Sequence, residues 1–370
     1  MRSLIGLWEE AASMDFTLQV RRRDIQDLRR KRVYAENYSR ARLFSRMAKG
    51  QVSLFKDFPV CIEAPSGANP REVVSKMIKT GFPNRQTARV QTGPSRTRYR
   101  LKIPEVMRRW EGERAILGVT DLHFRGTKFE RALDFSALND FDILCTDPNL
   151  VHFIEMMTLV ISSRGNVTDS HADDCDGSNH CFVGKKLWLA WDRIEGKAKG
   201  FQDIDRDYVT EQAAFDMRTF ISLPSARWFL VNPNETLFLP GSLAHKVITI
   251  KHYIGVGGFY VTLPNYLRSL KRWILYDTLD ITPKGLLGDL NKAVIQKIRE
   301  VQKGPNSLKH HWGLSYMQKA IEKWEKDEEF ETKEVLLKNQ YFKAFLEATC
   351  GLAKFPRAAK PMAGRYACPQ

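Results

Sequence analysis

The sequence has 370 residues, a formal net charge of +15 and a pI near 9.5. This length allows one large domain or two ordinary ones, and the positive charge favours acidic partners such as nucleic acid or acidic protein segments. No stretch approaches the roughly 18–20 apolar residues that span a bilayer, and the first residues do not resemble a secretion signal, so we expect an intracellular protein, nuclear or cytoplasmic.

Residues 1–114 are predicted to form a helical, basic N-terminal region. Apolar residues recur at helical spacing between residues 17 and 50, and helices are also expected at Arg71–Thr80 and Lys102–Trp110. The polar, basic segment Pro83–Thr97 contains a Gly-Pro pair and is interpreted as an exposed loop. The N-terminal third should therefore be mainly helical.

Two arginine-rich runs stand out in this region. They are Arg21–Arg23 and Arg29–Arg32. Such runs are usually solvated helix faces, but they can also contact phosphates or an acidic partner. Both interpretations stay open from the sequence.

Residues 115–265 change to short apolar runs separated by turn residues, which predicts a β-sandwich or barrel. Residues 201–214 are polar and acidic and are expected to form an insertion between strands. The expected strands are Ile116–Leu122, Phe141–Cys145, His152–Ser162, Cys181–Trp191, Trp228–Val231, Thr236–Leu239, His245–Ile250 and Tyr253–Thr262.

The helical period returns after Pro264 and predicts a C-terminal helical region over residues 266–354. Its last helix is expected at Glu334–Cys350. Residues 355–370 carry three prolines and no periodicity, so we expect a tail. The fold class predicted from the whole chain is α+β, with a β-barrel between helical flanks.

The chemistry is expected at His171 and Asp173, which project to one side if their segment is a strand. A second imidazole from His245 would complete a face of two histidines and one carboxylate, which leaves other positions of a ferrous ion open to oxygen and a co-substrate. Lys186 lies in an apolar strand-like segment, where a buried ammonium needs an anionic partner. Thr168 can share that face only if a bulge interrupts the strand.

The spacing of these residues resembles the JmjC family of iron(II)- and 2-oxoglutarate-dependent oxygenases. The resemblance rests on Thr168–Asp173, Gly184–Lys186, the segment Thr236–His245, and Gly257-Gly258, and it is nearest the lysine demethylase branch with a TDxHxD core. It implies a double-stranded β-helix of the cupin or jelly-roll kind. It also implies that His171, Asp173 and His245 bind Fe(II), and that Lys186 and Thr168 bind the distal carboxylate of 2-oxoglutarate, with O2 as oxidant.

The function that this resemblance implies is hydroxylation or N-demethylation of a protein, such as a histone tail or another basic, chromatin-associated protein. The chain departs from the demethylase pattern at Phe259, where those enzymes commonly carry asparagine, and no reader domain is evident. A small-molecule oxygenase is therefore an alternative. So is a non-catalytic scaffold that binds chromatin or nucleic acid through Arg21–Arg32 and Arg96–Arg109.

Two other interpretations of the central segment were weighed. A barrel that has lost its metal would leave His171 and His245 in ordinary hydrogen bonds. A zinc site of Cys175, His180 and Cys181 with His171 uses suitable ligand types, but its spacing matches no common zinc motif. Asp174 and Asp176 are expected to be solvated turn residues.

Overall fold

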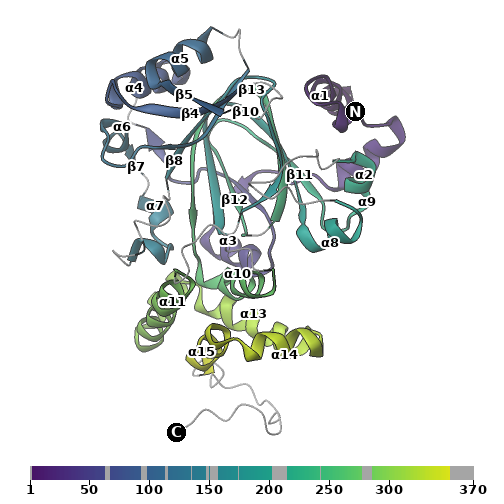
Figure 1. The fold of residues 1–370 in the computed structure, drawn as a ribbon, viewed down its shortest axis with the longest axis vertical. Helices are drawn as coiled ribbons and strands as arrows, with labels where there is room; N and C mark the ends of the chain where they lie inside the picture. The colour runs from purple at the N-terminus through teal and green to yellow at the C-terminus, as the bar shows by residue number, and fades with distance from the viewer. Residues whose placement is uncertain are drawn as a thin grey trace. The chain divides into compact units, whose positions relative to one another are not determined.

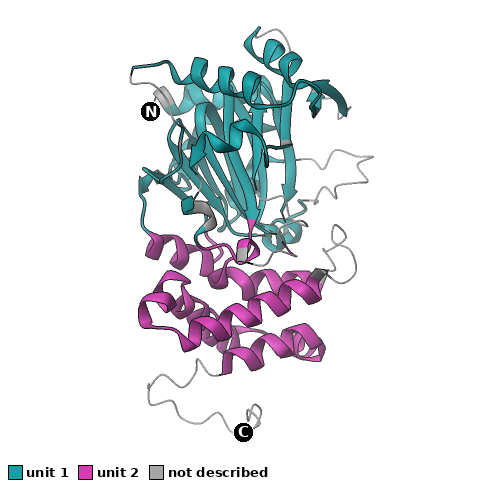
Figure 2. Ribbon diagram, turned by 90° about the vertical axis from the view of Figure 1, so that its left-hand side faces the viewer, with its two compact units in different colours: residues 1–39, 52–140, 155–259 teal, residues 40–51, 141–154, 260–370 magenta. Residues whose placement is uncertain are grey.

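The computed structural model describes residues 2–62, 67–92, 98–112, 116–134, 136–146, 150, 157–173, 175–201, 215–241, 243–276 and 286–350. The chain divides into two compact units, which Figure 2 colours separately. Unit 1 comprises residues 1–39, 52–140 and 155–259, and unit 2 comprises residues 40–51, 141–154 and 260–370. The expected tail, the insertion beyond Phe201 and Asp174 lie outside the described residues.

Unit 1 contains the strands and about half of the helices. Its strands are β1 (Glu36–Asn37), β2 (Ser53–Lys56), β3 (Cys61–Ile62), β4 (Thr87–Thr92), β5 (Arg98–Lys102), β6 (Leu117–His123), β7 (Leu133–Asp134), β8 (Thr158–Ser162), β9 (Val167–Ala172), β10 (Asp176–Asp192), β11 (Arg227–Val231), β12 (Glu235–Leu239) and β13 (Leu243–Tyr260). Its helices are α1 (Arg2–Met14), η1 (Phe16–Leu18), η2 (Arg22–Asp24), α2 (Ile25–Arg30), α4 (Pro70–Gly81), α5 (Ile103–Glu111), α6 (Lys128–Arg131), α7 (Ser136–Asn139), α8 (Arg193–Ala198) and α9 (Met217–Ser222).

Among the described residues, eleven strands form one large sheet and two form a small one, so the α+β class is confirmed (Figure 1). The order in the large sheet is β1-β2-β12-β10-β13-β8-β6-β4-β5, with β11 paired to β10 and β9 paired to β13. Strands β3 and β7 form the small sheet. The large sheet includes strands on both sides of residue 114, where the sequence suggested a boundary between regions.

Two long strands organise this sheet, because each pairs with different neighbours along its two halves. The first half of β10 pairs with β12 and its second half with β11. The first half of β13 pairs with β9 and its second half with β8. A Cβ at Gly257 would overlap the carbonyl oxygen of Ser178, so glycine lets β13 pass close to β10.

An apolar cluster that we call the inner cluster joins strands from distant positions of the sheet. Its members come from β8, β10, β11, β12 and β13 together with β2, so the sheet curves around them. They are Val52, Leu54, Val160, Cys181, Trp188, Ala190, Phe229, Val231, Leu237, Leu239, Leu243, Val247 and Tyr253. The opposite face of β10, β11 and β13 packs against α1, α2 and α9 through Trp8, Leu28 and Phe220, among others.

Several sequence expectations for unit 1 are wrong in detail. The loop expected at Pro83–Thr97 contains β4, and the mainly helical N-terminal third contributes β1, β2, β4 and β5 to the large sheet. The two strands expected at His245–Ile250 and Tyr253–Thr262 are one strand, β13. The helices expected at Arg71–Thr80 and Lys102–Trp110 are confirmed as α4 and α5.

Unit 2 is helical in its described part. Its elements are α3 (Arg40–Ala48), η3 (Leu144–Thr146), α10 (Leu263–Tyr276), α11 (Leu286–Lys303), α12 (Asn306–His311), α13 (Leu314–Asp327), α14 (Phe330–Lys338) and α15 (Gln340–Thr349). Aromatic pairs such as Phe44 with Tyr316 and Tyr266 with Phe345 pack these helices together. None of the helices in the described part of the chain is both long and apolar enough to cross a membrane.

Two expectations for unit 2 are corrected. The strand expected at Phe141–Cys145 is absent, because the buried Asp142 carboxylate accepts hydrogen bonds from the backbone N–H groups of Leu144 and Val261 and holds a turn there. The single helix expected at Glu334–Cys350 is two helices. Asn339 separates them and caps α15 by accepting from the Tyr341 N–H.

Candidate metal centre

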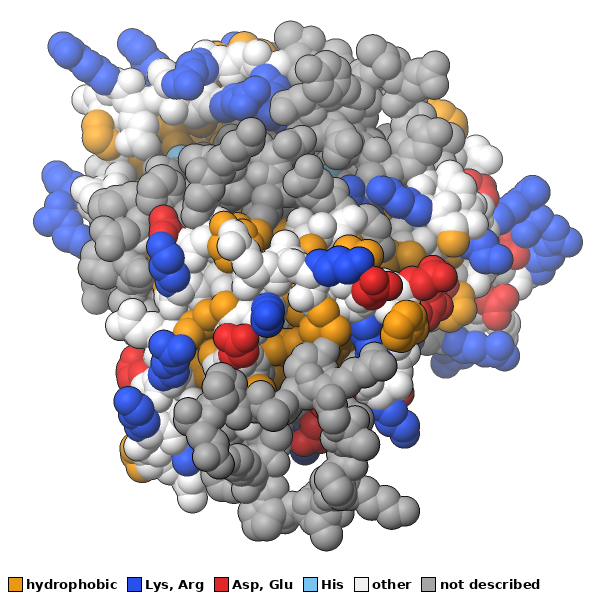
Figure 3. Space-filling model, turned by 60° about the horizontal axis from the view of Figure 1, so that its bottom comes forward, with side chains coloured by type: hydrophobic (Ala, Val, Ile, Leu, Met, Phe, Trp, Pro, Cys, Tyr) orange, Lys and Arg blue, Asp and Glu red, His pale blue; other side chains and the backbone are white. Residues whose placement is uncertain are grey.

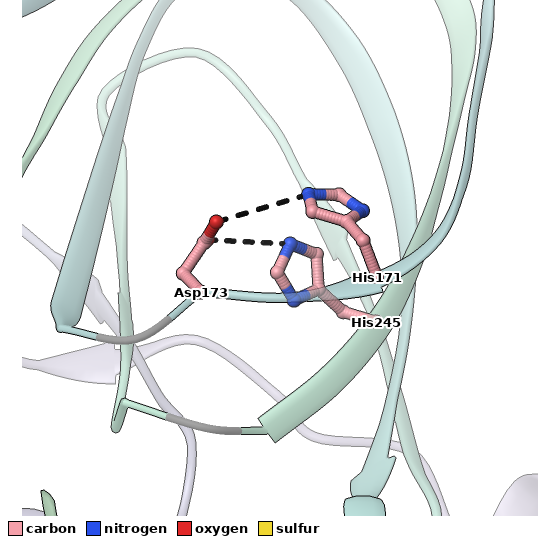
Figure 4. A group of neighbouring side chains, drawn as sticks. All are labelled: His171, Asp173 and His245. Carbon is pink, nitrogen blue, oxygen red and sulfur yellow. Dashed lines mark ion pairs between the residues drawn. The ribbon is translucent and has the colours of Figure 1, made fainter. Parts of the chain in front are cut away.

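Three of the residues singled out from the sequence meet at one end of β9 and β13. His171 and His245 are directly paired across these strands, and Asp173 follows the end of β9. Their ligand atoms all lie within 4.8 Å of one another (Figure 4). Nε2 of His171 is 3.9 Å and Nε2 of His245 is 3.6 Å from the carboxylate oxygens of Asp173.

Both imidazoles are oriented by the same kind of hydrogen bond. Nδ1 of His171 donates to the Asp169 carbonyl oxygen at 2.7 Å, and Nδ1 of His245 donates to the Leu243 carbonyl oxygen at 3.1 Å. A carbonyl only accepts, so Nδ1 carries the proton in each ring and the Nε2 lone pair is directed to the shared side. This arrangement is typical of metal-binding histidines.

The spacing of the donors suits one ion. Two atoms that bind the same ion at about 2.0–2.2 Å lie no more than about 4.4 Å apart, so both histidine to carboxylate separations permit a shared ion. The side chains of His171, Asp173 and His245 are 27 %, 17 % and 4 % exposed, which leaves the group partly open to solvent. The residues present therefore fit a metal with open coordination positions.

Lys186 enters the inner cluster from β10. It is 3 % exposed, and its Nζ lies 4.6 Å from the centroid of the Tyr253 ring. It forms no salt bridge with any acidic residue in the described part of the chain. Burial lowers the pKa of Lys186 to about 7, because the loss of hydration outweighs the opposing electrostatic effect of Cys181. A charged ammonium at this position is costly without an anionic partner.

Thr168 reaches the same face of β9 as His171 through a bulge. Thr168 is paired with Val247 and His171 with His245, so β9 has one more residue than β13 between these two pairs. Val247 belongs to the inner cluster, and directly paired residues point to the same side of a sheet. The irregularity that the sequence argument required for Thr168 is present.

Trp188 is a neighbour of the site. Its ring centroid is 5.5 Å from that of His245, and its indole N–H has no hydrogen-bond partner among the described residues. Trp188 follows Lys186 by two positions on β10, and this spacing is a signal in the sequence that the two share a face. A buried N–H without a partner is costly and is accounted for if a ligand accepts from it.

Sequence reasoning missed Tyr253 and Asn179 as neighbours of Lys186. The Tyr253 hydroxyl donates to the Asn179 side-chain oxygen beneath the Lys186 ammonium. No short-range pattern in the sequence links them, because they lie on β13 and β10 and are more than seventy positions apart.

Two of the candidate zinc ligands are engaged elsewhere. His180 is 2 % exposed with its Nδ1 on the Thr236 hydroxyl at 2.8 Å, and burial lowers its pKa to about 4. Cys181 belongs to the inner cluster. Among the described residues, the only group of three or more metal-ligating side chains is the His171, Asp173 and His245 group. Asp176 is 2 % exposed and accepts from the Gly241 N–H, so the expectation that it is solvated is wrong.

A buried ion-pair group supports the back of the metal centre. Lys246, which follows His245, is 3 % exposed and contacts Asp15 at 2.8 Å and Asp169 at 3.3 Å. Burial raises the pKa of Asp15, but the Lys246 ammonium and hydrogen bonds from Thr17 outweigh this and lower it overall. The pair therefore stabilises the fold above the unfolded-state pKa of Asp15, and this contribution is lost as pH falls through the lower folded value.

We expect Lys246→Met to lower the free energy of unfolding by about 3 kcal/mol, because it leaves two carboxylates without their buried cation. Urea denaturation at neutral pH measures the change. Lys251→Met removes an exposed lysine from the same strand and is the matched control. Equal stability of the two variants would contradict a supporting role for Lys246.

The chain matches no protein-family model, and it matches no curated protein sequence. The assignment of a function therefore depends on the residues and the geometry described above.

Proposed function

We propose that unit 1 is an Fe(II)- and 2-oxoglutarate-dependent oxygenase of the JmjC type, with its strands arranged as a double-stranded β-helix. The observation that carries the proposal is the meeting of His171, Asp173 and His245 with their ligand atoms within 4.8 Å. Two imidazoles and one carboxylate on one face of an ion are the ligand set of non-haem Fe(II) oxygenases. The absence of sulfur from this set distinguishes it from structural zinc sites.

The buried Lys186 favours a carboxylate-bearing co-substrate. An ammonium that is 3 % exposed and has no acidic partner among the described residues is costly until an anion binds beside it. Thr168 lies on the face of β9 that carries His171, and the Trp188 N–H still needs an acceptor. Together these groups provide one charge and two hydrogen bonds, which suit the distal carboxylate of 2-oxoglutarate.

The paired halves of β10 and β13 support the fold assignment. Strands β10 and β13 are adjacent in the sheet. Each also pairs with two further strands, β10 with β12 and β11, and β13 with β9 and β8, and these strands contribute to the inner cluster or lie beside it. In this arrangement β9 and β13 supply the metal ligands, while β10 supplies the anion receptor. A single curved sheet thus holds both halves of the proposed site.

When bound, Fe(II) and 2-oxoglutarate supply the activation of O2 and the oxidation of a C–H bond. The chain supplies the rest. The carbonyl groups of Asp169 and Leu243 hold the imidazoles in one tautomer, Lys186 orients the co-substrate, and the inner cluster excludes water. Such a site hydroxylates a carbon, or removes an N-methyl group after hydroxylating it.

The test is the consumption of 2-oxoglutarate. The purified protein, loaded anaerobically with Fe(II), is expected to produce succinate when oxygen and 2-oxoglutarate are added, and removal of the metal with EDTA is expected to abolish this. Re-addition of Fe(II), but not of Zn(II), should restore it. A folded, iron-loaded protein that neither binds nor consumes 2-oxoglutarate would overturn the proposal and favour a non-catalytic scaffold.

We propose a protein as the oxidised substrate, with a methylated histone tail or a protein side chain as the leading candidates. The support is the resemblance of the site to protein-modifying members of the JmjC family. Methylated peptides incubated with the iron-loaded protein should lose a methyl group or gain one oxygen atom by mass spectrometry. Turnover of 2-oxoglutarate without either change in any peptide would favour a small-molecule substrate, for which the half-buried Phe259 suits an apolar pocket.

A further inference from the structure

Some of the basic side chains of this protein form ion pairs, hydrogen bonds or ring contacts within the fold, and others do not. In the N-terminal arginine runs, Arg21 pairs with Asp24 at 2.7 Å and Lys31 donates to the Leu223 carbonyl oxygen. The Arg32 guanidinium lies 5.0 Å from the Trp228 ring centroid. Much of this segment therefore anchors α2 to the sheet, and its charge is less available to a partner than the sequence suggests.

The arginines of α5 share one carboxylate. Arg108 and Arg109 donate to the Glu105 carboxylate at 2.8 and 2.7 Å. These hydrogen bonds lower the pKa of Glu105 to about 2, and the bond from Arg108 has a larger effect than the bond from Arg109. Arg109 also donates to the Tyr99 hydroxyl at 3.0 Å. In the middle and lower part of the face shown in Figure 3, Lys and Arg side chains are likewise dispersed among Asp and Glu side chains, whereas those along its upper edge are not.

Four cations on one pair of strands have no such partners. Arg98, Arg100 and Lys102 alternate along β5, and Arg89 is the direct cross-strand partner of Arg100 on β4. All four are exposed, and none forms an ion pair with a described residue. Neither strand contains Asp or Glu. We call these four residues the ribbon cations.

The other face of this strand pair is covered. Ala88 and Val90 are buried on it, and Val106 and Trp110 of α5 are buried beside it (Figure 1). Because side chains alternate between the two faces of a strand, the ribbon cations all project to the opposite, solvent side. The result is a two-stranded ribbon that is apolar beneath and carries only positive charge above.

This concentration of charge destabilises the isolated ribbon, since like charges directly opposite each other repel. One explanation is protection of an edge, because β5 ends the large sheet and edge strands often carry charges that block pairing with other chains. That explanation covers β5 but not Arg89, which lies on the inner strand of the pair. A polyanion bound across both strands accounts for all four cations.

We propose that the ribbon cations bind the phosphodiester backbone of a double-stranded nucleic acid. Alternate residues of a strand are about 6.8 Å apart, so β5 presents three positive charges in a line with a fourth beside them. A two-stranded ribbon is also of a size that the major groove of DNA admits. No base-reading side chain is assigned, so binding is expected to be independent of sequence and strongly dependent on salt. This surface is independent of the proposed metal centre.

The test is the salt dependence of binding to a fluorescently labelled 20-base-pair DNA duplex, with an RNA duplex of equal length as a second arm. We expect the variant Arg89→Gln, Arg98→Gln, Arg100→Gln, Lys102→Gln to bind at least about tenfold more weakly, with the slope of log Kobs against log salt reduced by about 3–4. Replacing the three arginines by lysine should retain both affinity and slope. The two arms show whether the bound backbone is DNA, RNA or either.

The matched control is the variant Arg22→Gln, Arg23→Gln, Arg29→Gln, Arg30→Gln, which removes the same charge from exposed positions of unit 1. Its binding should stay close to that of the unchanged protein. Equal weakening in both variants would show a general charge effect and overturn the proposal, as would equal affinity for polyglutamate and for DNA. Because the ribbon variant removes repulsion between exposed side chains, it should melt no lower than the control.

Discussion

The variant His171→Ala is expected to lose metal binding and, with it, all 2-oxoglutarate turnover. Removing partners that merely orient metal ligands typically costs about 10–100-fold in metal affinity, so loss of a direct ligand should exceed about 100-fold. Two of the three donors would remain, but Asp173 and His245 alone enclose one side of an ion only. Titration with Co(II), followed by its visible absorption, measures the affinity without needing an active enzyme.

The matched control for this variant is His310→Ala, which removes an exposed histidine of unit 2. It should bind Co(II) as the unchanged protein does. His245→Ala should behave like His171→Ala, since its Nε2 faces the same carboxylate at 3.6 Å. If His171→Ala binds metal with unchanged affinity while it remains folded, these three residues are not a metal centre.

Two of the candidate metal ligands have a short-range signal in the sequence, whereas His245 lies on another strand more than seventy positions away. His171 and Asp173 are two positions apart, which is enough to place them on one side of a strand. The bulge that brings Thr168 to that face depends instead on the register between β9 and β13, which no local pattern specifies. The contact of Lys246 with Asp15 is similarly hidden, because it joins residues more than two hundred positions apart.

The fold was misjudged chiefly where charge obscured a strand. The segment Arg98–Lys102 alternates strictly between cations and the partly buried Tyr99 and Leu101, which is the period of a strand. The sequence analysis placed a loop at Pro83–Thr97, directly before this segment, and began the predicted barrel only at residue 115. Polar alternation of this kind indicates a strand with one face in water, and here that face carries the ribbon cations.

The long strands were missed for a different reason. Lys251 and His252 interrupt the apolar run of β13 and suggested a turn, whereas the strand continues through them to Tyr260. Beside this point Gly184 has a φ of 93°, a conformation that favours glycine, and a Cβ there would overlap the His252 carbonyl oxygen. The close passage of β10 and β13 therefore depends on glycines whose role appears only when the two strands are adjacent.

We expect Lys186→Met to abolish 2-oxoglutarate binding while making the ligand-free protein more stable. Methionine fills a similar volume without a charge, so it removes the cost of a buried ammonium. The pKa of Lys186 is about 7 in the folded protein and near its ordinary value of 10.5 when the chain unfolds. At about 1.4 kcal/mol per pKa unit, this difference corresponds to a stabilisation on the order of 5 kcal/mol below pH 7.

The sign of the pH dependence follows from the same shift. Between pH 7 and 10.5 the unfolded chain holds a proton that the folded chain has released, so the stability of the unchanged protein rises with pH across this window. The advantage of Lys186→Met is therefore largest below pH 7 and disappears toward pH 10.5. Urea denaturation at several pH values measures it, with Lys251→Met as a control for an exposed lysine on a neighbouring strand.

Binding of 2-oxoglutarate should show the complementary dependence. The co-substrate needs the charged ammonium, so above pH 7 binding requires that Lys186 take up a proton. The Kd of the unchanged protein is therefore expected to rise about tenfold per pH unit, up to the pH at which Lys186 loses its proton in the complex as well. In Lys186→Met, binding should be weak and independent of pH over the same range. If Lys186→Met keeps the affinity and pH profile of the unchanged protein for 2-oxoglutarate, Lys186 is not the anion receptor. If Lys186→Met is more stable but no longer binds 2-oxoglutarate, Lys186 is a residue retained for ligand binding at a cost in stability.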